Sequence, residues 1–202
     1  MAAIRWTALH CSLAAFTLKL DDDCFIRVRP LLAQLKAFGT RNAEGDEDSS
    51  PSLAPADLYG LLRTDEAVVR DPAVRYAVAP RYWPYARYPP FLAGVYLLRG
   101  GTTASKLYSA IVSEPTTDTL PALFIEDAYV TGLLAAKASL GIADLPGVVT
   151  LFTEEDKWEQ LERAMAALEA ADDNGEKEQY LIFYESLEEE DLRRFWRVFE
   201  DE

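Results

Sequence analysis

Leu18-Lys19-Leu20-Asp21-Asp22-Asp23-Cys24-Phe25-Ile26 gives the clearest indication of how this chain is organised. A short apolar run ends in three consecutive carboxylates, and a second apolar run follows at once. Three adjacent like charges repel one another and resist burial, so solvent, a basic partner or a divalent cation must compensate them. An Asp-x-Asp pair after a strand suits a cation that also holds a diphosphate, because hard cations prefer carboxylate oxygens. A charged surface turn is the simpler explanation of the triplet taken alone.

Composition limits the classes of protein to which the chain can belong. Half of its 202 residues are hydrophobic, which is enough for one domain with a substantial core. The net charge of −14 disfavours nucleic acid and anionic membrane surfaces as partners. Residues 153–202 carry 18 acidic and 6 basic side chains, against 16 and 14 in residues 1–152. The acidic excess therefore belongs to the C-terminal tail and not to the region of the triplet.

Cysteine and histidine are too scarce for most metal and redox sites. Cys11 and Cys24 form no metal motif and no disulfide framework, so we expect buried free thiols. His10 is the single histidine, which excludes His-rich metal sites and most His-based triads within this chain. No stretch approaches the roughly 20 apolar residues that span a bilayer, and the N-terminus has no signal-peptide pattern.

Helical and extended patterns alternate along the chain and predict an α/β layered domain. The expected helices cover residues 2–11, 30–38, 103–112 and 128–137, with two more beginning at Thr153 and Ser186. The expected strands cover residues 16–20, 25–28, 93–98, 123–125 and 179–184. Gly39 should close the second helix, and the acidic residues 39–56 should form a mobile loop. We expect residues 1–152 to form the main domain, with an acidic helix-strand-helix tail over residues 153–202 packed on it.

Two further segments have both a structural and a functional interpretation. Residues 76–96 combine seven aromatic side chains with closely spaced prolines, which forbids a helix and favours loop-rich backbone. Such a stretch is more often loop packing than a platform on which a sugar ring stacks. Glu126-Asp127 precedes the fourth expected helix, where carboxylates are favoured by the helix dipole. The functional alternative is a general base held at the end of a strand.

Together and in order, these features resemble the β1,3-galactosyltransferases and β1,3-N-acetylglucosaminyltransferases of the Golgi. The resemblance covers roughly residues 4–145. Its motifs, in chain order, are Trp6 and Cys11 ahead of Lys19, Asp21 to Asp23 and Phe25; Gly60, Arg70-Asp71 and Arg75-Tyr76; Tyr88-Pro89-Pro90-Phe91-Leu92-Ala93-Gly94-Val95-Tyr96; and Glu126-Asp127-Ala128-Tyr129-Val130-Thr131-Gly132. Four ordered motifs are specific together, whereas no single one would be.

The resemblance implies a Rossmann-like nucleotide-sugar glycosyltransferase fold of the Asp-x-Asp type. Asp21 and Asp23 would hold Mn²⁺ and the diphosphate of a UDP-sugar, and Asp22 would lie beside the sugar and ribose. These residues would face a cleft shared with Asp127. The partners would be a UDP-sugar donor and a glycan acceptor on a glycoprotein or glycolipid. The location would be the membrane of the Golgi apparatus, with this domain on the luminal side.

The same resemblance assigns the remaining site residues. Asp127 matches the catalytic base, which would take the proton of an acceptor hydroxyl, and Glu126 would support it. The segment from Tyr88 to Gly94, with Pro89 within it, would line the donor and acceptor pocket. Galactose or N-acetylglucosamine would be transferred in β1,3 linkage with inversion at the anomeric carbon.

The chain also departs from the family pattern. Family domains begin well before the triplet, so we expect the first strands of the fold to be lacking here. A histidine that often serves as a further metal ligand near the C-terminus has no counterpart, since Tyr184 or its neighbours occupy that region. One alternative is therefore an inactive fragment that binds or regulates an intact transferase. Another is an adaptor whose working part is the tail of residues 153–202.

Overall fold

The computed structural model describes residues 2–44, 56–113, 125–150, 159, 182–184 and 189–199. The chain forms two compact units. The first comprises Met1–Lys19 and Ala54–Asp144, and the second comprises Leu20–Leu53 and Leu145–Glu202. The mixture of helices and strands confirms the predicted α/β class.

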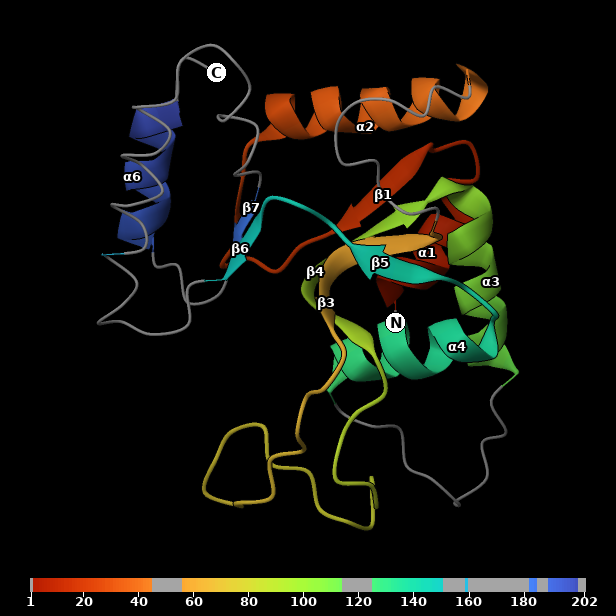
Figure 1. The fold of residues 1–202 in the computed structure, drawn as a ribbon, viewed down its shortest axis with the longest axis vertical. Helices are drawn as coiled ribbons and strands as arrows, with labels where there is room; N and C mark the ends of the chain where they lie inside the picture. The colour runs from red at the N-terminus through yellow and green to blue at the C-terminus, as the bar shows by residue number, and fades with distance from the viewer. Residues whose placement is uncertain are drawn as a thin grey trace. The chain divides into compact units, whose positions relative to one another are not determined.

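The first unit is built on a four-stranded mixed sheet (Figure 1). Its order is β1 (Phe16–Lys19), β4 (Phe91–Arg99), β3 (Leu58–Arg63) and β5 (Ile142–Asp144). The β1–β4 and β3–β4 pairs are antiparallel, and β3 and β5 are parallel. The central strand β4 reads as a nearly continuous apolar run and is buried along most of its length, as expected for a strand covered on both faces.

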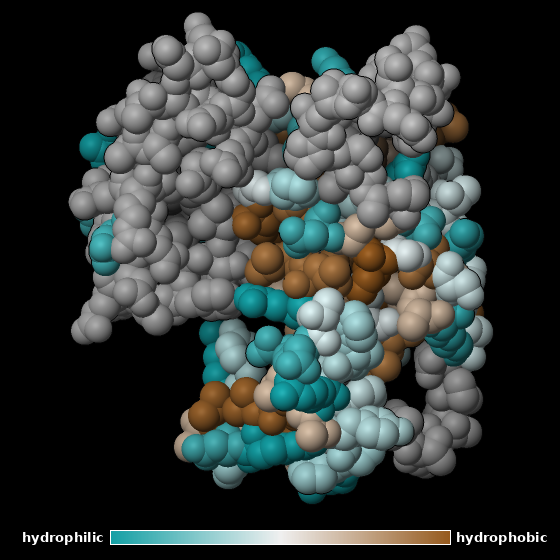
Figure 2. All heavy atoms as spheres, in the orientation of Figure 1, coloured by the Kyte–Doolittle hydropathy of each residue, from teal (hydrophilic) through white to brown (hydrophobic). Residues whose placement is uncertain are grey.

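A long connection without regular secondary structure, residues 64–90, joins β3 to β4 below the sheet (Figure 1). Proline density predicted this irregular backbone, and the prediction is confirmed. Figure 2 shows an apolar strip on this part of the surface, bordered by hydrophilic residues. The exposed large hydrophobic side chains of the connection over residues 64–90 are Val69, Val74, Tyr76 and Tyr85.

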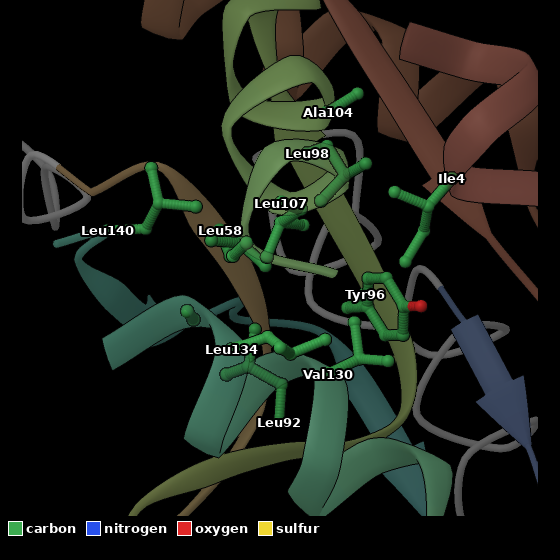
Figure 3. Close-up of a cluster of buried hydrophobic side chains, with 12 residues drawn as sticks. Ile4, Leu58, Leu92, Tyr96, Leu98, Ala104, Leu107, Val130, Leu134 and Leu140 are labelled. Carbon is green, nitrogen blue, oxygen red and sulfur yellow. The ribbon is translucent and has the colours of Figure 1, made fainter. Parts of the chain in front are cut away.

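Helices from three parts of the sequence pack on one face of the sheet. They are α1 (Ala2–His10), α3 (Gly100–Val112) and a π-helix, η1 (Ala128–Leu134), that continues into α4 (Ala135–Lys137). Figure 3 shows side chains from all of them meeting those of β4 and β3. This buried core comprises Ile4, Leu58, Leu92, Tyr96, Leu98, Ala104, Leu107, Ala110, Val130, Leu134, Ala135 and Leu140. The core fixes where η1 begins relative to β4.

The second unit contains a smaller sheet in the order β2 (Phe25–Ile26), β7 (Ile182–Tyr184) and β6 (Val148–Thr150). Its helices are α2 (Val28–Glu44) and α6 (Glu189–Phe199). The rings of Phe25 and Trp196 meet edge to face with centroids 6.0 Å apart. Within the described ranges of both units, no helix has the length and apolar character that a membrane crossing requires.

Several predicted boundaries are wrong. Gly39 does not close α2, which continues to Glu44, so residues 39–44 are helical and not part of a loop. Val28 begins α2 and does not extend the preceding strand. One glycine in a helix costs about 1 kcal/mol relative to alanine, which is too little to end a helix supported by its neighbours. Ile125 lies outside any strand.

Other predictions hold, or fall outside the described residues. The helices at 2–11, 103–112 and 128–137 and the strands at 16–20 and 93–98 are present with small boundary differences. The predicted strand at 179–184 and the last helix correspond to β7 and α6. Residues 45–55, 123–124 and most of the helix expected from Thr153 lie outside the description. The division of the chain at residue 152 stays a prediction.

Candidate active site

The middle of β4 departs from regular pairing where it passes Gly60 of β3. Gly60 pairs with Tyr96, but the pairing resumes at Ala93, so Gly94 and Val95 bulge out of the ladder. Gly94 has a φ of 66°, a left-handed conformation that glycine adopts without steric cost. A Cβ atom on Gly60 would lie 2.5 Å from the carbonyl oxygen of Val95. The bulge therefore depends on a glycine in each strand.

The carboxylate of Asp127 is attached to this bulge. The backbone N–H of Gly94 donates a hydrogen bond to Asp127 Oδ2 at 2.7 Å. The carbonyl oxygen of Gly94 accepts one from Lys19 Nζ at 3.0 Å, and Lys19 Nζ lies 4.0 Å from Asp127 Oδ1. The side chains of Lys19 and Asp127 are 19% and 25% exposed, so the pair is partly shielded yet still accessible to solvent. Three elements, β1, β4 and the start of η1, thus meet at one carboxylate.

Thr131 fixes the backbone of Asp127 against the start of β4. Its Oγ1 accepts the N–H of Leu92 at 2.8 Å and lies 2.7 Å from the carbonyl oxygen of Asp127 and 3.1 Å from that of Leu92. Because a hydroxyl has one hydrogen, Oγ1 donates to one of these carbonyls at a time. Thr131 is completely buried, so water does not compete for these bonds.

The position of Asp127 at a helix N-terminus does not account for its contacts. Asp127 precedes η1, but its side chain makes no capping hydrogen bond to that helix. The carboxylate reaches instead to Gly94, 33 residues earlier in the chain. π-helical turns are rare and often occur at functional sites. Glu126 is exposed, and its predicted supporting role stays a prediction.

Tyr88 and Pro89 lie where the 64–90 connection enters β4. A Cβ atom on Gly132 would stand 3.2 Å from Pro89 Cγ, so the glycine allows Pro89 to approach η1 closely. The Tyr88 ring stacks on Trp83 with centroids 6.4 Å apart and meets Phe91 edge to face at 5.9 Å. These contacts place the Tyr88–Gly94 segment against the helix that Asp127 precedes. Its predicted role in lining a pocket stays a prediction.

The environment of Tyr88 makes its hydroxyl harder to ionise. Burial raises the pKa of the Tyr88 hydroxyl, because the charged phenolate is poorly solvated there. The positive charge of Arg70 acts in the opposite direction, and the negative charge of Glu66 adds to the increase. Tyr88 therefore stays neutral over the physiological range.

Arg70 organises the aromatic connection from within. Its guanidinium donates to the carbonyl oxygens of Val78 at 2.6 Å, Trp83 at 2.8 Å and Tyr85 at 2.5 Å. Trp83 Nε1 in turn donates to the Arg87 carbonyl at 2.9 Å. The carbonyls thus converge on one planar cation, which holds the irregular backbone in place without strand or helix pairing.

The acidic triplet belongs to the second unit and forms a turn between β1 and β2. Asp21 and Asp22 are exposed, and Asp23 is half-buried with its Oδ1 3.8 Å from Cys24 Sγ. Neither Cys24 nor Cys11 forms a disulfide, and both are only half-buried, so the prediction of buried thiols is wrong in that respect. In the part of the chain that the structure describes, no three Asp, Glu, His or Cys side chains gather as a metal site would require.

The structure thus brings together some of the predicted site residues and adds others to the candidate site. Asp127 and Gly94, named separately in the sequence, are hydrogen-bonded partners. Sequence reasoning assigned no role to Lys19 or Thr131. Lys19 belongs to the motif around the acidic triplet. Thr131 follows Asp127 by one helical turn, and this spacing was the signal that could have linked the two residues. That the triplet faces Asp127 across a cleft stays a prediction.

Comparison with protein families tests the family resemblance that the sequence motifs suggested. The family model described as Galactosyltransferase matches residues 1–146, a range that contains the triplet, the bulge and Asp127. The chain belongs to the galactosyltransferase family. The resemblance inferred from the four ordered motifs is confirmed. Within this family, the anchored carboxylate of Asp127 becomes the first candidate for a catalytic group.

Curated members of the galactosyltransferase family align with the same part of the chain. Beta-1,3-galactosyltransferase 5 of Pan troglodytes is 30% identical over 152 residues, covering 75% of this chain and 44% of the relative. The Homo sapiens protein of that name is 28% identical over 152 residues, with 75% and 43% covered. The acetylgalactosaminyl-O-glycosyl-glycoprotein beta-1,3-N-acetylglucosaminyltransferase of Mus musculus is 30% identical over 147 residues, with 72% and 32% covered. This galactosyltransferase-family chain spans less than half the length of these relatives.

Proposed function

We propose that the chain is a glycosyltransferase that moves galactose or N-acetylglucosamine from a UDP-sugar to an acceptor sugar hydroxyl in β1,3 linkage. The observation that carries the proposal is the carboxylate of Asp127, held at the β4 bulge by the Gly94 N–H at 2.7 Å within the region matched to the family. The relatives' names supply the two sugar classes and the linkage. A Rossmann-like arrangement of the donor-binding strands is part of the proposal.

The proposed chemistry is a single displacement with inversion. The acceptor oxygen forms a bond to the anomeric carbon of the donor from the face opposite UDP. The bond between that carbon and the diphosphate oxygen breaks, and its electron pair leaves with UDP. The hydroxyl proton passes to Asp127, which therefore acts as general base, while the exposed Glu126 supports it. The carboxylate is partly exposed, so an acceptor can reach it.

Asp21 and Asp23 offer donor atoms that suit Mn²⁺. Their carboxylates are separated by one residue at a turn, and Asp21 is exposed. Oxygen ligands are those that such hard or borderline cations prefer. Because no three-residue cluster gathers among the described side chains, the proposal takes the remaining ligands from the diphosphate and water. When bound, the cation would neutralise charge on the departing UDP.

Two substitutions test this function. Transfer from UDP-galactose and UDP-N-acetylglucosamine to a panel of aryl β-glycosides is measured for the wild type and for Asp127→Asn, with Asp65→Asn as a matched control. Asp65 is an exposed carboxylate paired with Arg87 in the same unit. Loss of a general base should lower the rate about 10²–10⁴-fold in Asp127→Asn alone. Equal rates in the two variants would refute the base assignment.

The metal assignment has its own measurement. Calorimetric titration with UDP in the presence and absence of Mn²⁺ should show cation-dependent binding that Asp23→Ala abolishes and Asp65→Ala retains. A chain that binds neither UDP nor Mn²⁺, yet co-purifies with an active homologue, would instead support the alternative of a regulatory partner. Family resemblance further suggests a luminal Golgi location, which immunofluorescence of the full-length protein would check.

A further inference from the structure

Lys19 occupies an unusual position for a lysine at the end of an edge strand. Its register partner in β4 is Tyr96, whose ring is buried. Lys19 Nζ lies 5.6 Å from the centroid of that ring, close enough for a cation–π interaction. The side chain therefore runs along the sheet and is 19% exposed. A surface lysine whose only role is solubility would extend into water.

The ammonium group of Lys19 contacts both parts of the bulge assembly. It donates to the Gly94 carbonyl oxygen at 3.0 Å and lies 4.0 Å from Asp127 Oδ1. The N–H of the same glycine donates to Asp127 Oδ2. Lys19, Gly94 and Asp127 thus form a closed triangle in which each member contacts the other two. Movement of the lysine would release one side of the bulge and one oxygen of the carboxylate together.

We propose that Lys19 is a positioning residue that sets the orientation of the Asp127 carboxylate. The inference rests on the proposed function, in which Asp127 takes the acceptor proton. The lysine acts through Asp127 and Gly94, without touching the reacting atoms. It thereby links the strand that leads into the acidic triplet to the group that activates the acceptor.

Placement, and not charge, is the contribution that Lys19 makes. Aspartate side chains are already ionised near neutral pH, so a neighbouring cation is not needed to create the carboxylate. A positive charge also disfavours the neutral acid that forms when the base takes a proton. A nearby cation therefore does not assist the proton transfer through its charge. Misplacement of a reacting group by about 1 Å can cost 10²-fold in rate, which is the larger effect.

Kinetics separate a positioning role from a purely structural one. Lys19→Met keeps the unbranched apolar part of the side chain and removes the ammonium group. We expect kcat to fall about 10–100-fold, while KM for donor and acceptor stays within about twofold of the wild-type values. Lys19→Arg restores a donor and should recover part of kcat. Lys106→Met, at an exposed site on α3, is the matched control and should behave as wild type. A kcat of Lys19→Met equal to that of wild type, while Asp127→Asn is inactive, would overturn the proposal and leave the function standing.

A second measurement does not depend on turnover. The amide proton of Gly94, bonded to a carboxylate, should resonate downfield and exchange slowly in nuclear magnetic resonance spectra of the full chain. Both Lys19→Met and Asp127→Asn should shift this resonance and speed its exchange, whereas Lys106→Met should not. An unchanged Gly94 resonance in Lys19→Met would overturn the positioning role whatever the activity. A shifted resonance in a chain without transfer activity would refute the proposed function but retain the Lys19 contact.

Discussion

The backbone N–H of Gly94 donates to the carboxylate of Asp127 at 2.7 Å, joining the bulge of β4 to the residue that opens the π-helix η1. Gly94 can present this N–H because it lies outside the strand ladder. The carboxylate in turn satisfies a donor that the bulge leaves without a ladder partner. The bulge and the acid therefore depend on one another.

Gly60→Ala should disrupt the bulge from the neighbouring strand. The added Cβ would lie 2.5 Å from the Val95 carbonyl oxygen, a backbone atom that cannot withdraw without moving the bulge. We expect a loss of roughly 1–3 kcal/mol in the free energy of unfolding, measured with urea. Gly141→Ala is the control, since its nearest contacts would be at 3.7–3.9 Å. Equal stabilities of the two variants would contradict the geometry of the bulge.

Thr131→Val should cost more than Thr131→Ser, although valine is the closer match in shape. Valine leaves the buried N–H of Leu92 and the carbonyl of Asp127 without their hydroxyl partner. An unsatisfied buried donor costs roughly 1–3 kcal/mol, whereas serine loses one methyl, about 0.8 kcal/mol. Guanidinium unfolding would measure both variants. A serine variant that is the less stable of the two would show that the hydroxyl is dispensable.

Arg70→Met should loosen the aromatic connection while the sheet stays intact. Three backbone carbonyls, those of Val78, Trp83 and Tyr85, would lose their common donor. Amide exchange followed by mass spectrometry should become faster in peptides from residues 76–88 and remain unchanged in β4. Arg81→Met, which removes contacts with the hydroxyl and ring of Tyr82, should leave both rates as they are. Uniform acceleration across the first unit would contradict a local role.

Tyr88 should make the folded state sensitive to alkaline pH. Burial raises the pKa of its hydroxyl above the ordinary value of about 10. The group therefore contributes stability that is fully present below about pH 10 and is lost as pH rises through the folded-state pKa. Tyr88→Phe should flatten that decline in thermal unfolding between about pH 9 and pH 12. A decline of equal steepness in wild type and variant would exclude Tyr88 as its source.

Apolar patterning was sufficient to predict the main elements of the first unit. The run in β4 and the stripes of α1 and α3 follow directly from residue spacing. The strands β3 and β5 were not predicted. β5 has three residues, and β3 pairs with β4 through a register shift between Gly60 and Leu61 that depends on a distant strand. Local sequence cannot specify such a register.

The candidate site was predictable as a set of residues but not as an arrangement. Asp127 and Gly94 were identified from motif order, yet their hydrogen bond requires β4 to bulge opposite Gly60. Lys19 belongs to the motif around the acidic triplet, but no role could be predicted for it. The charge of a lysine follows from the sequence, but the direction in which its side chain extends does not. Only the β1–β4 register, which pairs Lys19 with Tyr96, brings the ammonium group to the carboxylate.

The bulge on β4 contains two residues, and that even number has an evolutionary consequence. Side chains alternate between the faces of a strand, so an insertion of two leaves the inside-outside pattern in phase on both sides of it. Leu92 and Tyr96 accordingly enter the same core from either side of the interruption. Deletion of one of the two bulge residues would move the side chains of half of the strand to the opposite face. Deletion of both residues would preserve the core but remove the backbone N–H that holds Asp127. The fold should therefore tolerate only the two-residue deletion, and that deletion removes the backbone N–H that holds the proposed catalytic carboxylate.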